Sequence, residues 1–173
     1  MTTWRQGKGV LYVVACGSSK AELVYAFVAR AQEEGWNVCA IVTPSAKKFL
    51  NIPLLSKVTG YPVRSEYKQP DEPDLLPRAD GIVVLPATFN TINKWALGIS
   101  DTLAVGILSE YTGLHTPIVA VPCCSGGLDT NPAFRRSLRM LKRYGIHVLS
   151  NESLTSDPFL NETILDNLTR GRE

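Results

Sequence analysis

The sequence predicts an α/β protein with a doubly wound, mostly parallel sheet of the Rossmann-like or flavodoxin-like type, flanked by helices. Strand-length apolar runs alternate with helical patterns along the 173 residues. Most of these runs are apolar throughout, which is typical of parallel strands buried on both faces. Three of the runs end in short polar segments. Because ligands of such sheets bind beyond the carboxyl ends of the strands, these ends are the candidate site.

The first two predicted elements are a strand and a helix. The apolar run Val10–Cys16 has strand length and ends at Gly17. Ser19 and Glu22 have the spacing of a capping box, which predicts a helix beginning at Ser19. Apolar residues then recur at helical spacing, at Val24, Phe27, Val28 and Ala31. Gly35 is placed to end this helix.

The remaining elements follow from the same patterns. Further strands are expected at residues 37–42, 63–67, 81–85, 118–121 and 146–149. Helices are expected at 45–50, 53–60, 90–99 and 101–111, from Pro132 to Gly145 with Asn131 as the cap, and from Leu160 onward. Prolines and acids make residues 69–77 an exposed loop. With no repeat or linker, we expect one domain over residues 1–173.

Composition argues against several partners. The net charge is +2, so charge alone suggests no nucleic acid partner, and no apolar run approaches the roughly 18 residues of a membrane span. The segment Met1–Lys8 is polar and lacks a signal core. Four cysteines without C-x-x-C spacing predict no metal site and a reduced, cytoplasmic protein. We interpret the N-x-S/T matches at Asn151, Asn161 and Asn167 as chance.

Two polar strand ends have the chemistry of an anion site. Gly17, Ser18 and Ser19 follow the first strand, where a helix start offers unpaired N–H groups and the serines add hydroxyls. Thr43 and Ser45 follow the second strand and add two more hydroxyls. An ordinary serine cap remains the alternative for the first segment. The absence of G-x-G-x-x-G, and of an acid at Thr43, disfavours a dinucleotide site.

The third polar strand end carries a family resemblance. Residues 85–101 read Leu-Pro-Ala-Thr-Phe-Asn-Thr-Ile-Asn-Lys-Trp-Ala-Leu-Gly-Ile-Ser-Asp. This stretch is similar to the signature of the homo-oligomeric flavin-containing cysteine decarboxylases, Pro-Ala-Ser-Ala-Asn-Thr followed by a helix ending Asn-Gly-Ile-Ala-Asp-Asn-Leu. Matching residues are Pro86, Ala87, Asn90, Thr91, Gly98, Ile99, Asp101 and Leu103, with Thr88 conservative for Ser. Phe89 replaces a small residue.

The resemblance implies a cofactor, a substrate type and an assembly. Family members bind FMN, which oxidises a cysteine thiol to a thioaldehyde and so eases the loss of CO2. The residues that would bind FMN here are Gly17, Ser18, Ser19, Thr43, Ser45, Pro86, Ala87, Thr88 and Thr91. Asn90 would bind a substrate carboxylate, although its position also suits a helix N-cap. The implied substrate is a small molecule or peptide.

The implied assembly is a homo-oligomer, either a trimer or a multiple of three. Trp95, Leu97 and Ile99 lie in a segment with few charges, which suits a contact between subunits. In an oligomer, His115 of one chain could approach the flavin of another. His147 lies in a predicted strand and is interpreted as structural. The basic residues Arg135, Arg136, Arg139, Lys142 and Arg143 are interpreted as the solvated face of a helix rather than as a nucleic acid site.

The sequence departs from the family pattern in two places. The usual catalytic His is missing before Ala79–Asp80, and the usual Pro-x-Met-Asn clamp is replaced by Pro122-Cys-Cys-Ser-Gly-Gly. Cys123 and Cys124 are candidate catalytic thiols, or simply small residues of a tight loop. The departures predict retained FMN binding and weakened cysteine decarboxylation. Two alternatives stay open: a flavin prenyltransferase-like enzyme, and a non-catalytic flavoprotein serving as a binding or regulatory subunit.

Overall fold

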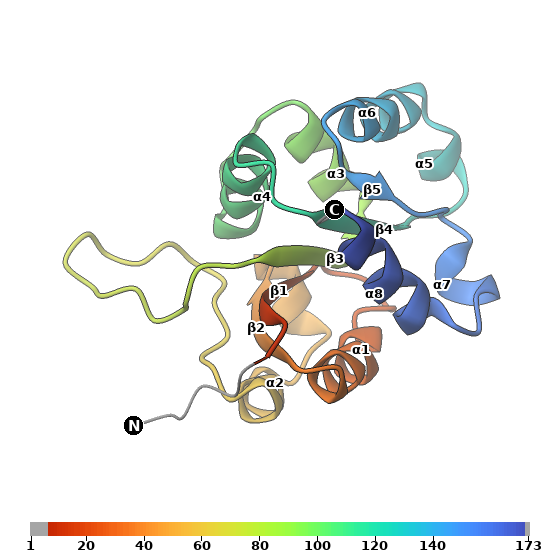
Figure 1. The fold of residues 1–173 in the computed structure, drawn as a ribbon. Coiled ribbons are helices and arrows are strands. Elements are labelled where there is room, and N and C mark those ends of the chain that lie inside the picture. The colour runs from red at the N-terminus through yellow and green to blue at the C-terminus, as the bar shows by residue number, and fades with distance from the viewer. Residues whose placement is uncertain (1–6, 172–173) are drawn as a thin grey trace.

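A five-stranded parallel sheet forms the centre of the molecule (Figure 1). The computed structural model describes residues 7–171, so the first six residues of the polar segment Met1–Lys8 lie outside it. The strands are β1 (Gly9–Ala15), β2 (Trp36–Val42), β3 (Gly81–Thr88), β4 (Ile118–Cys123) and β5 (His147–Val148). Their order is β2-β1-β3-β4-β5, and every neighbouring pair is parallel. This confirms the predicted doubly wound α/β fold.

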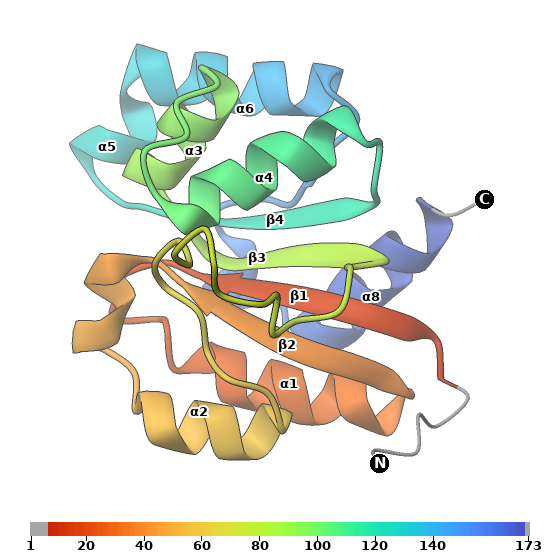
Figure 2. The ribbon, with the colours of Figure 1, turned by 90° about the vertical axis from the view of Figure 1, so that its left-hand side faces the viewer.

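Helices cover both faces of the sheet (Figure 2). One face carries α1 (Leu23–Glu33), α2 (Ile52–Thr59) and α8 (Leu160–Arg170), and the other carries α3 (Phe89–Ala96), α4 (Leu103–Gly113) and α6 (Pro132–Arg143). Successive side chains of a strand point to opposite faces, so Leu11 and Val13 belong to one core and Tyr12 and Val14 to the other. No helix described between residues 7 and 171 is long and apolar enough to cross a membrane.

Several predicted helix ends are confirmed by their backbone geometry. Gly35 and Gly145 have φ angles of 93° and 89°, in the left-handed region that favours glycine after a helix. The Asn131 side chain accepts a hydrogen bond from the N–H of Ala133, and Pro132 occupies the first turn of α6. The basic side chains of α6 are exposed, as predicted for its solvated face.

A long crossing loop connects β2 and α2 to β3. The strand order places β1 between β2 and β3, so the chain crosses to the other face of the sheet over residues 61–80, which project from the body in Figure 1. Within the predicted strand at 63–67, the structure forms one bridge, between Ile41 and Arg64. Farther on, the Tyr67 hydroxyl donates to the carbonyl of Thr102 and fills the space that a side chain at Gly106 would need.

The loop is also fastened at its far end, by two tyrosines. The Tyr12 hydroxyl donates to the carbonyl of Pro77 at 2.7 Å. The N–H of Ala79 donates to the Tyr111 hydroxyl at 3.1 Å. Together with Tyr67, these contacts fix both ends of the predicted loop at 69–77 and leave its middle exposed.

The first helix corrects one prediction. It begins at Leu23 rather than Ser19, so the predicted capping box of Ser19 and Glu22 is wrong. The physical reason lies in the residue before it: the Ser18 side chain accepts from the N–H of Lys20, and its carbonyl accepts from the N–H of Ala21. Residues 18–22 therefore form tight turns, since the side chain of Ser18 competes for backbone groups that a helix would use.

The third strand is longer than predicted. It continues beyond residue 85 to Thr88, through Pro86, whose peptide bond with Leu85 is cis. Pairing with β4 shifts register between Val84 and Ala87 and then resumes at Ala87 and Thr88. The extension carries the polar end of β3 level with the end of β4, which matters for the site. At the other edge, β5 spans only two residues.

Candidate functional site

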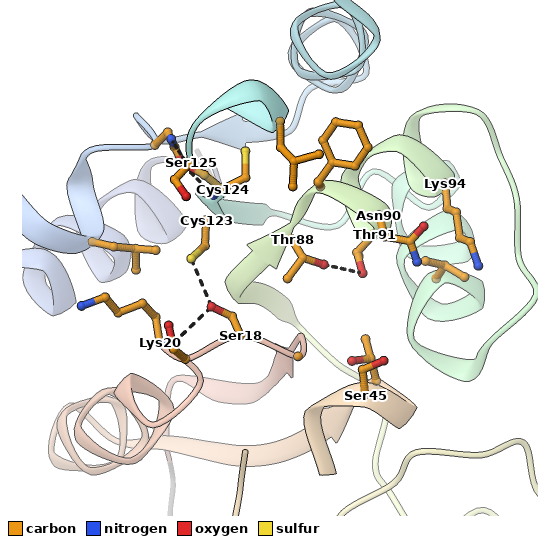
Figure 3. A pocket seen from close by; sticks show the side chains of 18 of the residues that line it. Ser18, Lys20, Ser45, Thr88, Asn90, Thr91, Lys94, Cys123, Cys124 and Ser125 are labelled. Carbon is orange, nitrogen blue, oxygen red and sulfur yellow. Dashed lines mark hydrogen bonds between the residues drawn. The ribbon is translucent and has the colours of Figure 1, made fainter. Parts of the chain in front are cut away.

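The polar strand ends meet in one cavity of about 860 Å³ (Figure 3), within the size range of small-molecule sites. The cavity lies beyond the carboxyl ends of β1, β2, β3 and β4. The chain leaves β1 and β3 toward opposite sides of the sheet, so this is the switch point of the topology. A flavodoxin-like strand order places its ligand at that point. The structure thus brings together the three predicted polar segments and a fourth strand end, which carries the predicted thiols Cys123 and Cys124.

Gly17 and Ser18 form the first wall. A Cβ atom added to Gly17 would lie 2.7 Å from the Cβ of Ser45 and 2.9 Å from its carbonyl carbon. Only glycine therefore lets the end of β1 approach the segment that follows β2. Ser18 lies at the centre of the cavity, while Ser19 and Lys20 are exposed at its rim. This wall presents two hydroxyls and one ammonium group, and it contains no acid.

Thr43 and Ser45 form the second wall, at the start of a short 3₁₀ helix, η1 (Pro44–Lys48). Thr43 is buried, and its hydroxyl accepts from the N–H of Ala46, so it caps the helix. Ser45 is exposed and lines the cavity. Of these two predicted cofactor residues, Ser45 therefore has the freer hydroxyl.

The third wall is the junction of β3 and α3. The N-cap of α3 is Thr88, so Asn90 lies inside the first turn and its alternative interpretation as the N-cap is wrong. Asn90 is exposed at the cavity, as Figure 3 shows. Thr91 is buried, accepts from the thiol of Cys16 at 3.3 Å and lies 3.4 Å from the Thr88 hydroxyl. It thus holds the ends of β1 and β3 together.

Two predicted cofactor residues lie beneath the cavity rather than at its surface. Pro86 and Ala87 are buried in β3 and do not line it. They lie where the pairing of β3 with β4 shifts register, and this shift places Thr88 opposite Cys123.

The two adjacent cysteines differ in their surroundings. The sulfur of Cys123 lies 3.3 Å from the Ser18 hydroxyl, and either atom can donate. The Cys124 side chain packs against the core on the α3, α4 and α6 face. Burial, followed by the nearby Asp129 and Cys123, raises the pKa of the Cys124 thiol to about 11.

We expect Cys124 to alkylate slowly. Its pKa of about 11 lies well above that of an ordinary cysteine, so at pH 8 its thiolate fraction is smaller by about 100-fold or more. Iodoacetamide labelling followed by tandem mass spectrometry should show Cys124 reacting more slowly than Cys123 at pH 8. The rate at Cys124 should rise with each pH unit up to about 11. Equal rates for the two thiols would contradict this assignment.

Sequence reasoning missed the cations of the cavity. Lys20 and Lys94 line it, against one acid, Glu152. Lys94 lies one helical turn after Asn90 and forms an ion pair with Asp101 at 2.6 Å. The i, i+4 spacing of Asn90 and Lys94 on a helix is a signal that could have linked them. The apolar walls, from Phe89, Val105, Leu128 and Leu154, come from four separate segments.

Both histidines lie away from this cavity. His115 and His147 line a second hollow at the amino ends of β4 and β5. Neighbouring Lys142 and Arg170 add to burial in lowering the pKa of His147. No cluster of three or more metal-binding side chains exists among residues 7–171. Among residues 7–171, no histidine of this chain lines the cavity at the strand ends.

The predicted subunit contact is only partly available. Leu97 and Ile99 are exposed, but Trp95 is 2% exposed and its indole N–H donates to the Thr112 hydroxyl. Including Trp95 in an intersubunit surface was therefore wrong, because it belongs to the core between α3 and α4. The oligomeric state stays a prediction.

Comparisons with known proteins agree with this geometry. The Flavoprotein family model matches residues 3–170. Epidermin decarboxylase of Staphylococcus epidermidis is 26% identical over 163 residues, covering 93% of this chain and 88% of that protein. The coenzyme A biosynthesis bifunctional protein CoaBC of Thermococcus kodakarensis is 30% identical over 114 residues, covering 65% of this chain. The matched part is 27% of the length of that relative.

Solved structures show the same fold. The FMN-dependent cysteine decarboxylase SpaF superposes with a TM-score of 0.78 at 22% identity, covering 96% of this chain and 99% of the other. The peptidyl-cysteine decarboxylase EpiD gives a TM-score of 0.74 at 25% identity, covering 93% and 98%. Since the family model extends over nearly the whole sequence, the chain belongs to the Flavoprotein family.

Proposed function

We propose that the protein binds FMN in the cavity at the ends of β1 to β4 and holds a carboxylate-bearing substrate beside it. The observation that carries this proposal is the meeting of four polar strand ends at the β1–β3 switch point. In flavodoxin-like sheets this is the position of FMN, an analogy at the level of the fold. The structural neighbour SpaF, which is described as FMN-dependent, supports the same cofactor.

The first wall fits the phosphate of FMN. Ser18 and Ser19 offer hydroxyl donors, Lys20 offers a positive charge, and Ser45 adds a hydroxyl from across the cavity. Charge-assisted hydrogen bonds to a phosphate are the strong ones. The apolar side chains of Phe89, Val105, Leu128 and Leu154 offer surface for an aromatic ring, and such a mixture is typical of cofactor sites.

The third wall fits a carboxylate. The Asn90 amide is a donor at the rim of the cavity, and Lys94, one turn along α3, adds positive charge. Bound FMN supplies an electron acceptor for substrate oxidation. The protein side chains position the substrate and exclude water. We therefore infer a substrate that carries a carboxylate and a thiol, as suggested by the cysteine decarboxylase names of the structural neighbours SpaF and EpiD.

Replacing Ser18 and Ser19 together with Ala should weaken FMN binding by about 1–3 kcal/mol, because each removed donor would bond to a charged phosphate. Titration followed by flavin fluorescence should show Kd rising about 5- to 150-fold. Riboflavin, which lacks the phosphate, should bind both forms of the protein similarly. A control with Ser100 and Ser109 changed to Ala removes a hydroxyl pair outside this cavity and should leave Kd unchanged.

The proposal also has a decisive test without mutation. Purified protein should be yellow, or should become so after incubation with FMN, and heat should release the flavin unchanged. Protein that stays colourless and shows no FMN binding by titration would overturn it. A homo-oligomer remains part of the proposal, and light scattering that shows a strict monomer at micromolar concentration would remove that part alone.

A non-catalytic binding or regulatory role is the second candidate. One observation favours it: neither histidine of the chain lines the cavity described above. Under this role FMN and a carboxylate ligand would bind without turnover. The substrate experiment described in the Discussion separates the two candidates.

A further inference from the structure

Asn151 makes two hydrogen bonds to the backbone of a single residue at the cavity. Its carbonyl oxygen accepts from the N–H of Cys124 at 2.9 Å, and its amide nitrogen donates to the carbonyl of Cys124 at 2.6 Å. A side-chain amide with this geometry takes the place of a neighbouring strand. The sequence pattern around Asn151 suggested only a chance glycosylation match, which gave no hint of this role.

The reason for this arrangement lies in Pro122. Strands β4 and β5 pair at Val119 and Ala120, and the N–H of Leu149 donates to the carbonyl of Ala120. In a parallel ladder the next donor on β4 would be residue 122, but proline has no N–H. Backbone pairing therefore ends there. The Asn151 carboxamide resumes it two residues later, at Cys124.

The position of Cys123 depends on this contact. In extended backbone, successive side chains point in opposite directions, so fixing the Cys124 peptide with its side chain on the core directs Cys123 the other way. Its sulfur then lies 3.3 Å from the Ser18 hydroxyl, a contact that Figure 3 marks with a dashed line. The next residues, Ser125 and Gly126, are exposed, and Gly126 has a φ of 58°. Because both residues are exposed, they add no side-chain packing that would fix the turn after Cys124.

The same contact joins two walls of the cavity. Asn151 lines the cavity, and so do Glu152, Leu154 and Thr155 of the segment that follows it. Its carboxamide ties this segment to the end of β4. A change at residue 151 would therefore move both the thiol and the adjoining wall.

We propose that Asn151 is a positioning residue: by holding the Cys124 peptide it keeps the Cys123 thiol in contact with Ser18 at the wall of the proposed flavin site. Its removal frees the turn at residues 122–126 and uncouples the two side chains. The role concerns the protein alone and can be measured without flavin, so its failure is distinguishable from a failure of the FMN proposal.

The test measures Cys123 alkylation in the flavin-free protein. Iodoacetamide rates, resolved by tandem mass spectrometry between pH 6 and pH 10, should rise about tenfold for Asn151→Ala, since an opened turn exposes the thiol. In the otherwise unchanged protein, Ser18→Ala should change the Cys123 alkylation rate by at least about twofold, because it removes the hydroxyl that contacts the thiol. In the Asn151→Ala background it should have no further effect, which is the signature of coupled residues.

Controls separate positioning from a general loss of stability. Asn167→Ala removes one carboxamide hydrogen bond, to the carbonyl of Thr163 in α8, outside the cavity, and should leave Cys123 unchanged. If Asn151→Ala does not fold, Asn151→Asp keeps the acceptor for the Cys124 N–H while losing the donor, and should show the same loss of coupling. A folded Asn151 variant with native Cys123 rates and native coupling to Ser18 would overturn the proposal.

Discussion

Gly17→Ala should both destabilise the protein and abolish tight FMN binding. The added methyl carbon would lie 2.7 Å from the Cβ of Ser45 and 2.9 Å from its carbonyl carbon, where no ordinary contact exists. One of the two segments must move, and overpacking of this kind costs about 1–3 kcal/mol. Because both segments line the proposed phosphate site, we expect Kd for FMN to rise at least about tenfold, or about 1.4 kcal/mol.

The matched control for this prediction is Gly113→Ala. Gly113 is the last residue of α4, and a Cβ there would meet nothing within 4 Å. Alanine favours a helix over glycine by up to about 1 kcal/mol, so this change should be neutral or slightly stabilising. Urea denaturation of the flavin-free proteins measures stability, and flavin fluorescence measures affinity. Native stability and affinity in Gly17→Ala would show that the close approach to Ser45 is not required.

Decarboxylation of a simple cysteine-terminal substrate should be slow or absent. A positioned acid–base group contributes roughly 100- to 10,000-fold in rate, and the cavity holds no imidazole from its own chain. Glu72 and Asp74 lie in the loop where the family has its histidine, but both are exposed. A carboxylate there also repels a substrate carboxylate.

The measurement uses the flavin-loaded protein with phosphopantothenoylcysteine and with short peptides ending in cysteine. Flavin bleaching with a loss of about 46 mass units, CO2 and two hydrogens, reports oxidative decarboxylation, whereas a loss of about 44 mass units, CO2 alone, reports turnover in which the flavin returns to its oxidised form. Free FMN with each substrate gives the background rate. Rapid turnover would contradict the prediction and assign the missing roles to Cys123, Cys124 or the loop at 69–77.

Two further arms of this experiment separate the remaining functions. No turnover, with tight binding of a carboxylate ligand that Asn90→Ala abolishes, would identify a site that kept its binding asparagine and changed its chemistry. Reaction of reduced FMN with a prenyl phosphate would instead support the prenyltransferase-like alternative. Lys94 pairs with Asp101, so Asp101→Asn should leave a freer ammonium group beside Asn90 and strengthen carboxylate binding.

Local patterns predicted the fold because its elements are marked locally. Gly35 and Gly145 end helices with φ angles that glycine adopts readily, and Asn131 with Pro132 starts one. The failed prediction at Ser19 also has a local cause, because the side chain of the neighbouring Ser18 accepts the hydrogen bond from the N–H of Lys20. Periodicity alone does not decide between two such competing caps.

The site was predictable in its strand ends but not in its long-range contacts. Ser18 and Ser45 were expected at the cavity because parallel strands bring their carboxyl ends to one edge. The contact of Ser18 with Cys123 spans 105 residues, and that of Asn151 with Cys124 spans 27 residues across a strand pair. Neither contact produces a periodic pattern in the sequence. Trp95 was misassigned because a buried aromatic and a contact aromatic have the same sequence pattern.

The crossing loop shows where this molecule can change without altering its centre. Tyr67 fastens one end to α4, and Tyr12 and Tyr111 fasten the other, so the chain between Lys68 and Leu76 is bounded by fixed points. Lengthening a flexible surface loop costs little, about 0.6 kcal/mol for each doubling. Insertions and deletions in that stretch can therefore accumulate during evolution, or be introduced by design, while the strand ends keep their spacing.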